Sequence, residues 1–499
     1  MIKYLSFFGL LPFLVIAPLR AEAQDSLAVE EVVLRALQEN LRLRIDGVEV
    51  LIAKRDVTIQ ESAFDTNVFA SGTQRGSRAP GYNNVDGIRS HSTLLRAGVS
   101  KRLNTGGELQ LTTNYARNST GITSEILNPA HTSDLSVSLR QPLLDGLGSD
   151  INLIPIQTSE LDAVRSELFL KSTALQIMEL SEYAYWDLAY AHEVKKLRTA
   201  SLEVAQKLLE ENQERERVGL ATNIDVLQAQ VFVATSEEAT LSAGALIDNS
   251  QDRLFRQMGS TDYPENNVLV KPLPDISTEE IGTPTSLSTI LANNPDYLQQ
   301  RLNIDIWELL VKSNRNSILP TVDLVAGLGF SGLDDSLIDS YGNTLERDGY
   351  DWTAGVEFRV PWGQRADKAR YQQTRNGLYR EKLRLADIEQ DIQVINRSNW
   401  RDWVTGVERV KAAKLSLNLA SEQFDREQTK YESGLATFRE LLEARNDQDE
   451  ANLRFLSSIL DAVKAKITNM ALDASLPQRY GLSWDATSDL LDTIEEESR

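Results

Sequence analysis

The chain has 499 residues, of which 52 are lysine or arginine and 73 are aspartate or glutamate, and it contains no cysteine. Its formal net charge of −21 argues against a nucleic-acid-binding protein, because neutralising phosphates requires a basic surface. The lack of cysteine excludes a disulfide framework, a thiolate metal site and a cysteine nucleophile. Charged residues at 25% and hydrophobic residues at 41% are typical of a folded protein. Length alone suggests about three domains.

The first segment predicts export from the cytoplasm. Residues 7–19 form an apolar run behind Lys3, and residues 21–23 read A-E-A, which matches the A-x-A cleavage site of a signal peptide. The run of 13 residues is too short to span a bilayer as a helix. We therefore expect residues 1–23 to be a cleaved signal peptide. No other apolar run approaches about 18 residues, so we expect any membrane contact to use a β-barrel or to be peripheral.

The chain repeats itself at an offset of 215 residues. Residues 219–229 read GLATNIDVLQA and residues 434–444 read GLATFRELLEA, with six of eleven positions identical. Two more pairs of segments match in the same order: QPLLDG at 141–146 with VPWG at 360–363, and ALQEN at 36–40 with ILANN at 290–294. Three landmarks in one order favour a duplicated architecture over a chance similarity of two helical hairpins.

The duplication predicts how the chain is organised. The expected segments are a signal peptide at 1–23, a first repeat at 24–262, a linker at 263–283, a second repeat at 284–481 and an acidic tail at 482–499. The first repeat is longer by 35 residues, and the excess falls between Asn40 and Pro142. Two tandem repeats thus replace the three domains that length suggests.

Each repeat is predicted to contain a helix, strands, a long helix, a turn and a final helix. Residues 156–217 contain neither proline nor glycine, and a helix of these 62 residues would be ~93 Å long. Residues 366–432 form the matching stretch of the second repeat. The first stretch carries apolar residues at 3.5-residue spacing, interrupted by Lys171 and Glu182: Leu161, Val164, Leu168, Leu175, Met178, Tyr185 and Ala189. Each long helix ends at a glycine, Gly219 or Gly434, where we expect the chain to reverse.

Between these helices, apolar and polar residues alternate with a period of two, which predicts β-strands. The alternating segments include 95–99, 108–115, 135–140, 321–330 and 351–360. We count four strand candidates in the first repeat and two in the second, so the 35 extra residues suffice for one further pair. In an exported protein this alternation fits strands that face lipid on one side and water on the other, although a soluble sandwich shows it too. Sequence leaves open whether the extra pair lies in a barrel or over its mouth.

Taken together, these features resemble the TolC family of outer-membrane efflux proteins. The resemblance rests on the duplicated GLAT turn, the QPLLDG exit from the strands and the order of the elements, and it covers nearly the whole mature chain. It implies a mainly α-helical fold with a transmembrane β-barrel. The protein would be a homotrimer, with one shared barrel in outer-membrane lipid and a helical tunnel through the periplasm. Two strands per repeat would give twelve strands in the trimer.

The resemblance also implies a function. The protein would be a passive export duct of a tripartite efflux or type I secretion system, not an enzyme, and it would need no cofactor. Its partners would be a periplasmic adaptor (membrane fusion) protein and an inner-membrane transporter. The adaptor would dock at the two tips, formed by Gly219, Leu220, Ala221, Thr222, Gly434, Leu435, Ala436 and Thr437.

Three acidic residues follow these tips. Thr222 with Asp225 and Thr437 with Glu440 have capping-box spacing, which explains two of the acids on structural grounds alone. Glu443 lies one helical turn beyond Glu440, and capping does not explain it. The resemblance implies that Glu440, Glu443 and Asp225 line the channel constriction. A ring of carboxylates from three chains would attract cations and could bind divalent ions that block passage.

The closed state of the tip needs a support. In the family an arginine two residues after the tip glycine serves this purpose, and here that position is Ala436. We therefore consider Arg439 as a substitute, or packing around Tyr431, which matches the family.

Other patterns point to different classes of protein. Residues 327–332 read GLGFSG, which fits G-x-G-x-x-G, but we expect an acidic loop without a helix after them, which argues against a dinucleotide site. His91, His131 and His192 are scattered, so we expect neither a metal site nor a catalytic triad. The alternative function is a soluble periplasmic coiled-coil scaffold or adaptor whose strands form an ordinary sandwich.

Overall fold

The computed structural model describes residues 26–78, 89–121, 126–276, 282–347, 349–482, 491 and 493–496. The predicted signal peptide and most of the predicted acidic tail lie outside them. The chain divides into two compact units, and each unit takes segments from both halves of the sequence. One unit contains residues 1–39, 180–280 and 405–464, and the other contains residues 40–179, 281–404 and 465–499.

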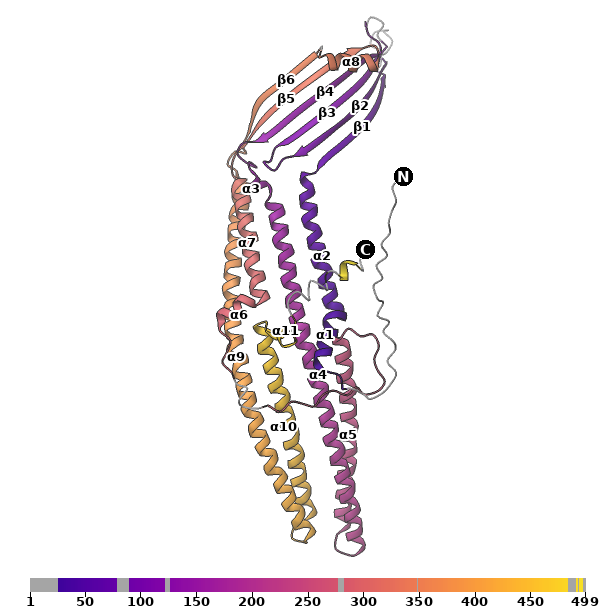
Figure 1. Ribbon diagram of the computed structural model, residues 1–499, viewed down its shortest axis with the longest axis vertical. Coiled ribbons are helices and arrows are strands. Elements are labelled where there is room, and N and C mark those ends of the chain that lie inside the picture. The colour runs from indigo at the N-terminus through magenta and orange to yellow at the C-terminus, as the bar shows by residue number, and fades with distance from the viewer. Residues whose placement is uncertain are drawn as a thin grey trace, which may run out of the picture. The chain divides into compact units, whose positions relative to one another are not determined.

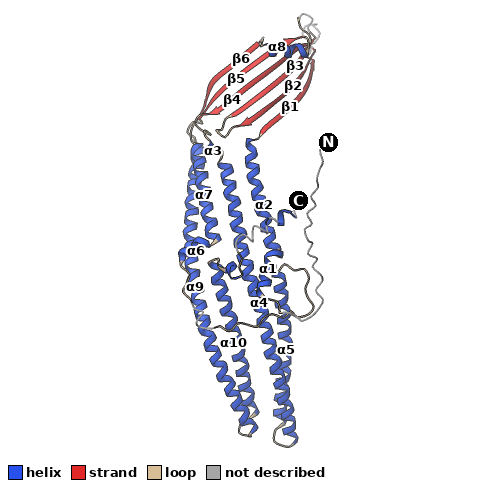
Figure 2. Cartoon of the chain, viewed as in Figure 1, coloured by secondary structure: helices blue, strands red, loops and turns tan. Residues whose placement is uncertain are grey.

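Most of the chain is helical, as Figure 2 shows. The helices are α1 (Val29–Glu39), α2 (Leu41–Glu61), α3 (Ser149–Asn152), α4 (Ile154–Arg217), α5 (Asn223–Gln257), α6 (Leu287–Asn293), α7 (Pro295–Asn316), α8 (Leu337–Glu346), α9 (Arg365–Glu432), α10 (Phe438–Leu472) and α11 (Leu476–Arg479), with a 3₁₀ turn at Ser62–Phe64. The predicted long helices are α4, with 64 residues, and α9, with 68. Among the helices in the described part of the chain, none is both long enough and apolar enough to cross a membrane.

The asparagines of the ALQEN and ILANN segments explain why those segments match. Asn40 is the N-cap of α2, and its Oδ1 accepts from the backbone N–H of Arg42 at 3.0 Å. Asn294 is the N-cap of α7, and its Oδ1 accepts from Asp296 and Tyr297, each at 3.1 Å. Both caps have extended backbone angles, so each asparagine ends one helix and starts the next.

The unit containing residues 40–179 and 281–404 holds a single six-stranded antiparallel sheet (Figure 1). Its strands lie in chain order: β1 (Thr66–Arg78), β2 (Arg89–Arg102), β3 (Glu108–Thr120), β4 (Ala130–Pro142), β5 (Thr321–Asp334) and β6 (Gly349–Arg359). Four strands come from the first half of the chain and two from the second. The pairing of β4 with β5 joins the two halves into one sheet.

The register gives the sheet two different faces. Residues that pair across neighbouring strands lie on the same face. One row across all six strands is apolar: Val68, Val99, Leu111, Val137, Leu328 and Trp352. The adjacent row faces the other way and is small or polar: Asn67, Ser100, Gln110, Ser138, Gly327 and Thr353. The apolar row is open to its surroundings, with Val68 79% and Trp352 69% exposed.

One expectation about this region is wrong. The acidic segment after residues 327–332 was expected to be a loop, but it contains the ten-residue helix α8. Ser336 caps the helix by accepting from the backbone N–H of Asp339 at 3.2 Å. The helix packs a small, polar side on the sheet, where Thr344 Oγ1 lies 2.6 Å from Ser133 Oγ. Its stability therefore depends on tertiary contacts that an apolar stripe in the sequence does not reveal. Residues 327–332 themselves lie inside β5.

The other unit contains α1, α5 and the lower parts of α4, α9 and α10. Its core near α1 includes the fully buried Val32 and Tyr185. The Tyr185 hydroxyl donates to the Leu27 carbonyl at 2.9 Å and accepts from the Lys271 N–H at 3.0 Å, so it ties two extended segments to α4. His192 contacts the Val268 carbonyl at 3.0 Å. This histidine thus has a structural role in holding the segment that follows α5.

Candidate functional site at the hairpin tips

Two helical hairpins end in tight turns of the same design (Figure 1). Gly219 follows α4 with φ 78°, and Gly434 follows α9 with φ 75°. In each turn the next residue reaches back along the helix: Leu220 N–H donates to the Arg215 carbonyl, and Leu435 N–H donates to the Lys430 carbonyl, both at 2.8 Å. These are Schellman bonds, and they require a left-handed residue that glycine supplies without strain. The two predicted reversals therefore lie where the sequence places them.

A capping box begins the helix after each turn. Thr222 N–H donates to Asp225 Oδ2 at 2.8 Å, and Asp225 N–H donates back to Thr222 Oγ1 at 3.3 Å. In the second hairpin, Thr437 N–H donates to Glu440 Oε2 at 2.7 Å, and Glu440 N–H donates to Thr437 Oγ1 at 3.3 Å. Both boxes satisfy helix-end N–H groups that would otherwise be unpaired. The structural role of Asp225 and Glu440 is therefore established within one chain.

Glu440 is held in its ionised form. The bonds from the Thr437 backbone and hydroxyl lower the pKa of the Glu440 carboxyl. Glu443 lies one turn further along α10 and is exposed. In a single chain, the carboxylate of Glu440 thus accepts hydrogen bonds from the helix cap, while the side chain of Glu443 is exposed to solvent.

Tyr431 connects the two hairpins. Its hydroxyl on α9 donates to Asn212 Oδ1 on α4 at 2.8 Å, and the two residues are 5% and 0% exposed. Arg215 on α4 places its guanidinium carbon 4.3 Å from the Tyr431 ring centroid and donates from Nη1 to the Tyr431 carbonyl at 3.3 Å. Burial raises the pKa of the Tyr431 hydroxyl, so it stays a hydrogen-bond donor at neutral pH. Asn212 and Arg215 were not singled out from sequence.

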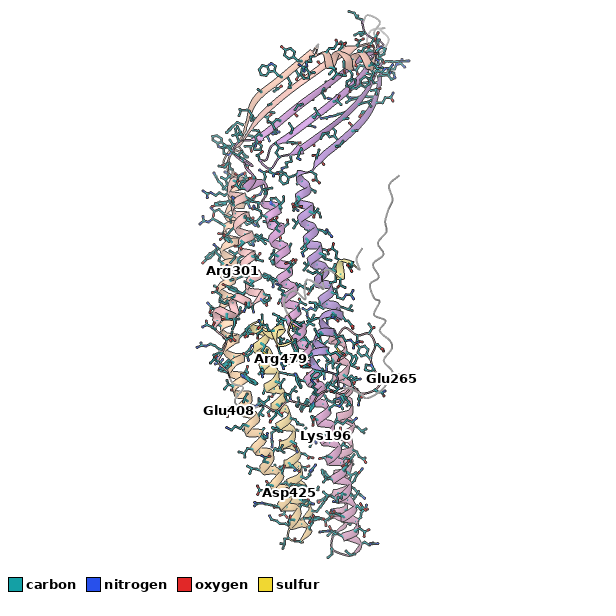
Figure 3. The ribbon with its side chains drawn as sticks, viewed as in Figure 1. Lys196, Glu265, Arg301, Glu408, Asp425 and Arg479 are labelled. Atoms are coloured by element: carbon teal, nitrogen blue, oxygen red, sulfur yellow. The ribbon has the colours of Figure 1, made fainter. Side chains whose placement is uncertain are left out.

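An apolar cluster surrounds this contact. It combines residues from α4, α5, α9 and α10: Leu208, Ala229, Phe424, Tyr431, Phe438, Leu441 and Ala444. Tyr431 and Phe438 stand on either side of the Gly434 turn, with ring centroids 5.8 Å apart. Figure 3 labels Asp425 on the part of α9 that leads into this turn. The cluster packs the tips of both hairpins against each other.

Arg439 lies differently from Tyr431. Its side chain is exposed on the first turn of α10. Among the residues that the structure describes, no ion pair or hydrogen bond joins Arg439 to Asp225 or Glu440. Ala436 is half-buried against the apolar cluster instead of offering a charge. Support of the tip by Arg439 stays a prediction, while the contacts of Tyr431 are present in one chain.

A buried ion pair lies further along the same hairpins. Arg445 and Asp449 on α10 are 8% and 7% exposed, and Arg445 Nη2 lies 3.1 Å from Asp449 Oδ1. Arg445 Nη2 also donates to Ser201 Oγ on α4 at 2.9 Å, and the Ser201 hydroxyl donates to Asp449. The guanidinium carbon lies 5.4 Å from the Phe424 ring centroid. This network joins α4, α9 and α10, and no local sequence motif predicts it.

A groove of about 700 Å³ runs beside this network. Its walls come from α4, α5 and α10, with apolar side chains including Leu227, Phe232 and Leu453. Asp449 lies at one side of the groove, and Ile224 lies toward the tip. An elongated apolar surface is therefore open beside the capped turns.

The remaining acidic cluster lies at the far end of β5. Carboxylate oxygens of Asp334, Asp335 and Asp339 lie within 4.8 Å of one another. Two of the three have local partners: Asp334 accepts from the Asn343 side chain at 2.9 Å, and Asp339 accepts from the Ser336 hydroxyl at 2.5 Å. Capping and turn contacts account for these acids.

Long helical hairpins with capped tips and a sheet with one apolar and one polar face are features expected of an outer-membrane channel with a helical periplasmic extension. The model of the family "Outer membrane efflux protein" matches residues 286–468. The outer membrane efflux protein BepC of Brucella suis is 22% identical over 337 residues, which cover 67% of this chain and 70% of BepC. The outer membrane protein TolC of Escherichia coli is 23% identical over 288 residues, 54% of this chain and 57% of TolC.

The fold agrees with these similarities. The crystal structure of the Campylobacter jejuni CmeC outer membrane channel superposes with a TM-score of 0.70 at 16% identity, covering 94% of this chain and 89% of CmeC. The chain is therefore similar in sequence to outer membrane efflux proteins of the TolC type, and the mainly helical fold with a β-barrel portion is confirmed. It is an outer-membrane protein that extends into the periplasm.

Proposed function

We propose that this protein is the outer-membrane duct of a tripartite efflux or type I secretion system, assembled as a homotrimer and gated at its hairpin tips. The observation that carries the gate is the Tyr431 contact, because it links two hairpins through buried groups at the level of the turns. The two-faced sheet supports the membrane half, since its apolar row is exposed on a single chain. The alternative of a soluble scaffold is not favoured, because it would leave this face in water.

The constriction would be formed by acids of the second tip. Glu440 and Glu443 lie one turn apart on α10, directly after the capped turn, and Asp225 occupies the corresponding cap in the first hairpin. In a trimer, three copies of this arrangement would meet around one axis. Carboxylates gathered there would favour cations and could hold a divalent ion in the closed state.

Opening would require the second hairpin to move away from the first. The Tyr431–Asn212 bond and the contacts of Arg215 resist this motion, because they join α9 to α4. The apolar groove beside α5 and α10 offers a docking surface for a helical periplasmic adaptor, and the tip residues 219–222 and 434–437 would be the first points of contact. Binding energy from the adaptor would then offset the loss of the Tyr431 contacts. An inner-membrane transporter would supply the cargo and the energy for export.

Planar-bilayer recordings test the role of the acids. The Glu440→Ala/Glu443→Ala variant should lose much of its cation preference and its block by divalent ions. The Glu237→Ala/Glu238→Ala variant removes the same charge from an exposed part of α5 and is the matched control. Selectivity and block that stay unchanged in the first variant would reject the assignment of the constriction. Recovery of the wild-type protein as a soluble periplasmic monomer would reject the channel itself.

A further inference from the structure

We propose that the barrel of this protein is larger than the twelve-stranded barrel that two strands per repeat would give. Each chain contributes six strands, and β1 of one protomer pairs with β6 of the next, so that a trimer closes eighteen strands. The inference rests on the proposed homotrimer. In this arrangement β1 and β6 form the seam between subunits, and β3 is an interior strand of the sheet.

The extra strands belong to the sheet over their whole length. β1 pairs with β2 from Thr66↔Lys101 to Arg78↔Arg89, and β2 pairs with β3 from Ser90↔Thr120 to Arg102↔Glu108. A hairpin folded over the mouth of a barrel would leave β3 as the edge. Here β3 has a strand on each side, and the apolar row continues without a break through β2 to Val68 on β1.

The turn between β2 and β3 is anchored where the strands meet the helices. Gln141, the first residue of the QPLLDG segment, donates from Nε2 to the Thr105 carbonyl at 3.1 Å and accepts from the Thr105 hydroxyl at 2.9 Å. Gly148 N–H donates to the same carbonyl at 3.1 Å. Arg102 at the end of β2 donates to Asn152 Oδ1 at 3.2 Å. The extra pair is therefore fixed at its helix-facing end to the β4–α4 connection.

The two outer edges need a partner. Within the described residues, β1 and β6 each have a strand on one side only. An unpaired edge in hydrocarbon would leave a row of N–H and C=O groups without water or protein to bind. Closing a single chain on itself would make a six-stranded barrel, fewer strands than the eight whose interior just holds packed side chains. Six alternating strands make β1 and β6 antiparallel to each other, so another copy can join edge to edge and continue the same pattern.

The strand number sets the width of the barrel. With strands about 4.8 Å apart and tilted by about 40°, twelve strands give a backbone radius of ~12 Å and eighteen give ~18 Å. The cross-section inside the backbone would therefore be roughly twice as large. Such a barrel would pass or house bulkier cargo than a twelve-stranded one.

Cysteine cross-linking tests the seam, and the chain offers a background without native thiols. Double variants would combine a cysteine at Val68, Ala70 or Gly72 on β1 with one at Trp352, Ala354 or Val356 on β6, to cover the unknown register. Five strand spacings separate β1 from β6 within one chain, well beyond the Cα distance that a disulfide allows. Oxidation in the membrane should therefore yield dimers and trimers for at least one pair. Val137→Cys/Leu328→Cys, a paired position inside one chain, is the positive control.

The outcomes separate this inference from the proposed function. Covalent trimers through β1 and β6 would support it. Cross-linking of Leu111→Cys on β3 to Trp352→Cys, with no β1–β6 product, would show that β1 and β2 lie outside the barrel; the inference would fail and the channel would stand. A trimer with no β1–β6 product in any register would overturn it as well. A monomeric protein without any product between chains would overturn both.

Discussion

Removing one hydroxyl group should change how often the tip opens. Tyr431→Phe keeps the ring and with it the contacts to Phe438 and Arg215, but it removes the donor that lies 2.8 Å from Asn212 Oδ1. Asn212 is fully buried, so its Oδ1 would lose that donor without access to water. Leaving a buried acceptor unpaired costs about 1–3 kcal/mol. If the bond exists only in the closed state, the opening equilibrium should rise about 5- to 150-fold.

Single-channel recording of the purified protein in planar bilayers measures this change directly. The open fraction of Tyr431→Phe should exceed that of the wild type, while thermal unfolding should show that both proteins are folded. Asn212→Ala and the double variant complete a double-mutant cycle, and the double variant should open little more than either single variant because both break the same bond. An open fraction equal to that of the wild type, or effects that simply add, would refute the role of this bond in closure.

Three further predictions concern the stability of the helices. Gly219→Ala or Gly434→Ala should lower the free energy of unfolding by about 1–2 kcal/mol, as measured by thermal unfolding, because the backbone has a positive φ at both positions although no neighbouring atom would contact the new Cβ. Gly244→Ala, in the helical interior of α5, is the control and should be neutral or stabilising by up to about 1 kcal/mol. Asp449→Ala should destabilise the unit that contains the tips by about 3–5 kcal/mol, because it leaves Arg445 buried without its counter-charge. Replacing both residues by apolar ones should recover part of that loss. Equal losses of stability in the single and double variants would contradict this prediction. Burial tends to raise the pKa of Glu381, but hydrogen bonds from Gln300, Arg380 and Arg384 outweigh this effect and lower the pKa. The wild type should therefore be more stable than Glu381→Gln above the ordinary glutamate pKa, and this advantage should fade as the pH falls from there through the lowered pKa of the folded state. An advantage of the wild type that grows with acidity would contradict this prediction.

The parts of the fold that were predicted correctly are those encoded by neighbours in sequence. A glycine after a long helix and a threonine three residues before an acid specify a left-handed turn and a capping box, whatever the rest of the chain does. Both tips therefore lie where the sequence places them, at Gly219 and Gly434. The period-two pattern likewise predicted strands, because it reports only which faces are apolar.

The parts that sequence could not supply depend on distant partners. Asn212 and Tyr431 are separated by 219 positions, and neither residue is unusual in its own helix. The predicted stripe of α4 holds at Leu175, Met178, Tyr185 and Ala189, which are buried. It fails at two positions for a related reason: Val164 is 46% exposed although it lies on the stripe, and Glu182 is fully buried although it should interrupt it. Trp186 Nε1 lies 3.4 Å from Glu182 Oε1, so the interior of the unit provides that carboxylate with polar contacts. Helix α8 was missed because it is stabilised by the sheet beneath it.

The two repeats share a backbone design but not the contact that would hold the gate. At the offset of 215 residues, Tyr431 corresponds to Glu216 and Asn212 corresponds to Glu427. The position equivalent to the Tyr431–Asn212 bond therefore carries two acids, which cannot form the same buried hydrogen bond. Glu216 and Glu427 instead interact locally, with the Asn223 side chain at 3.3 Å and with Lys430 at 2.6 Å. A duplicated scaffold thus gives two capped tips, and divergence of a few side chains leaves only one of the two equivalent pairs able to form this buried hydrogen bond.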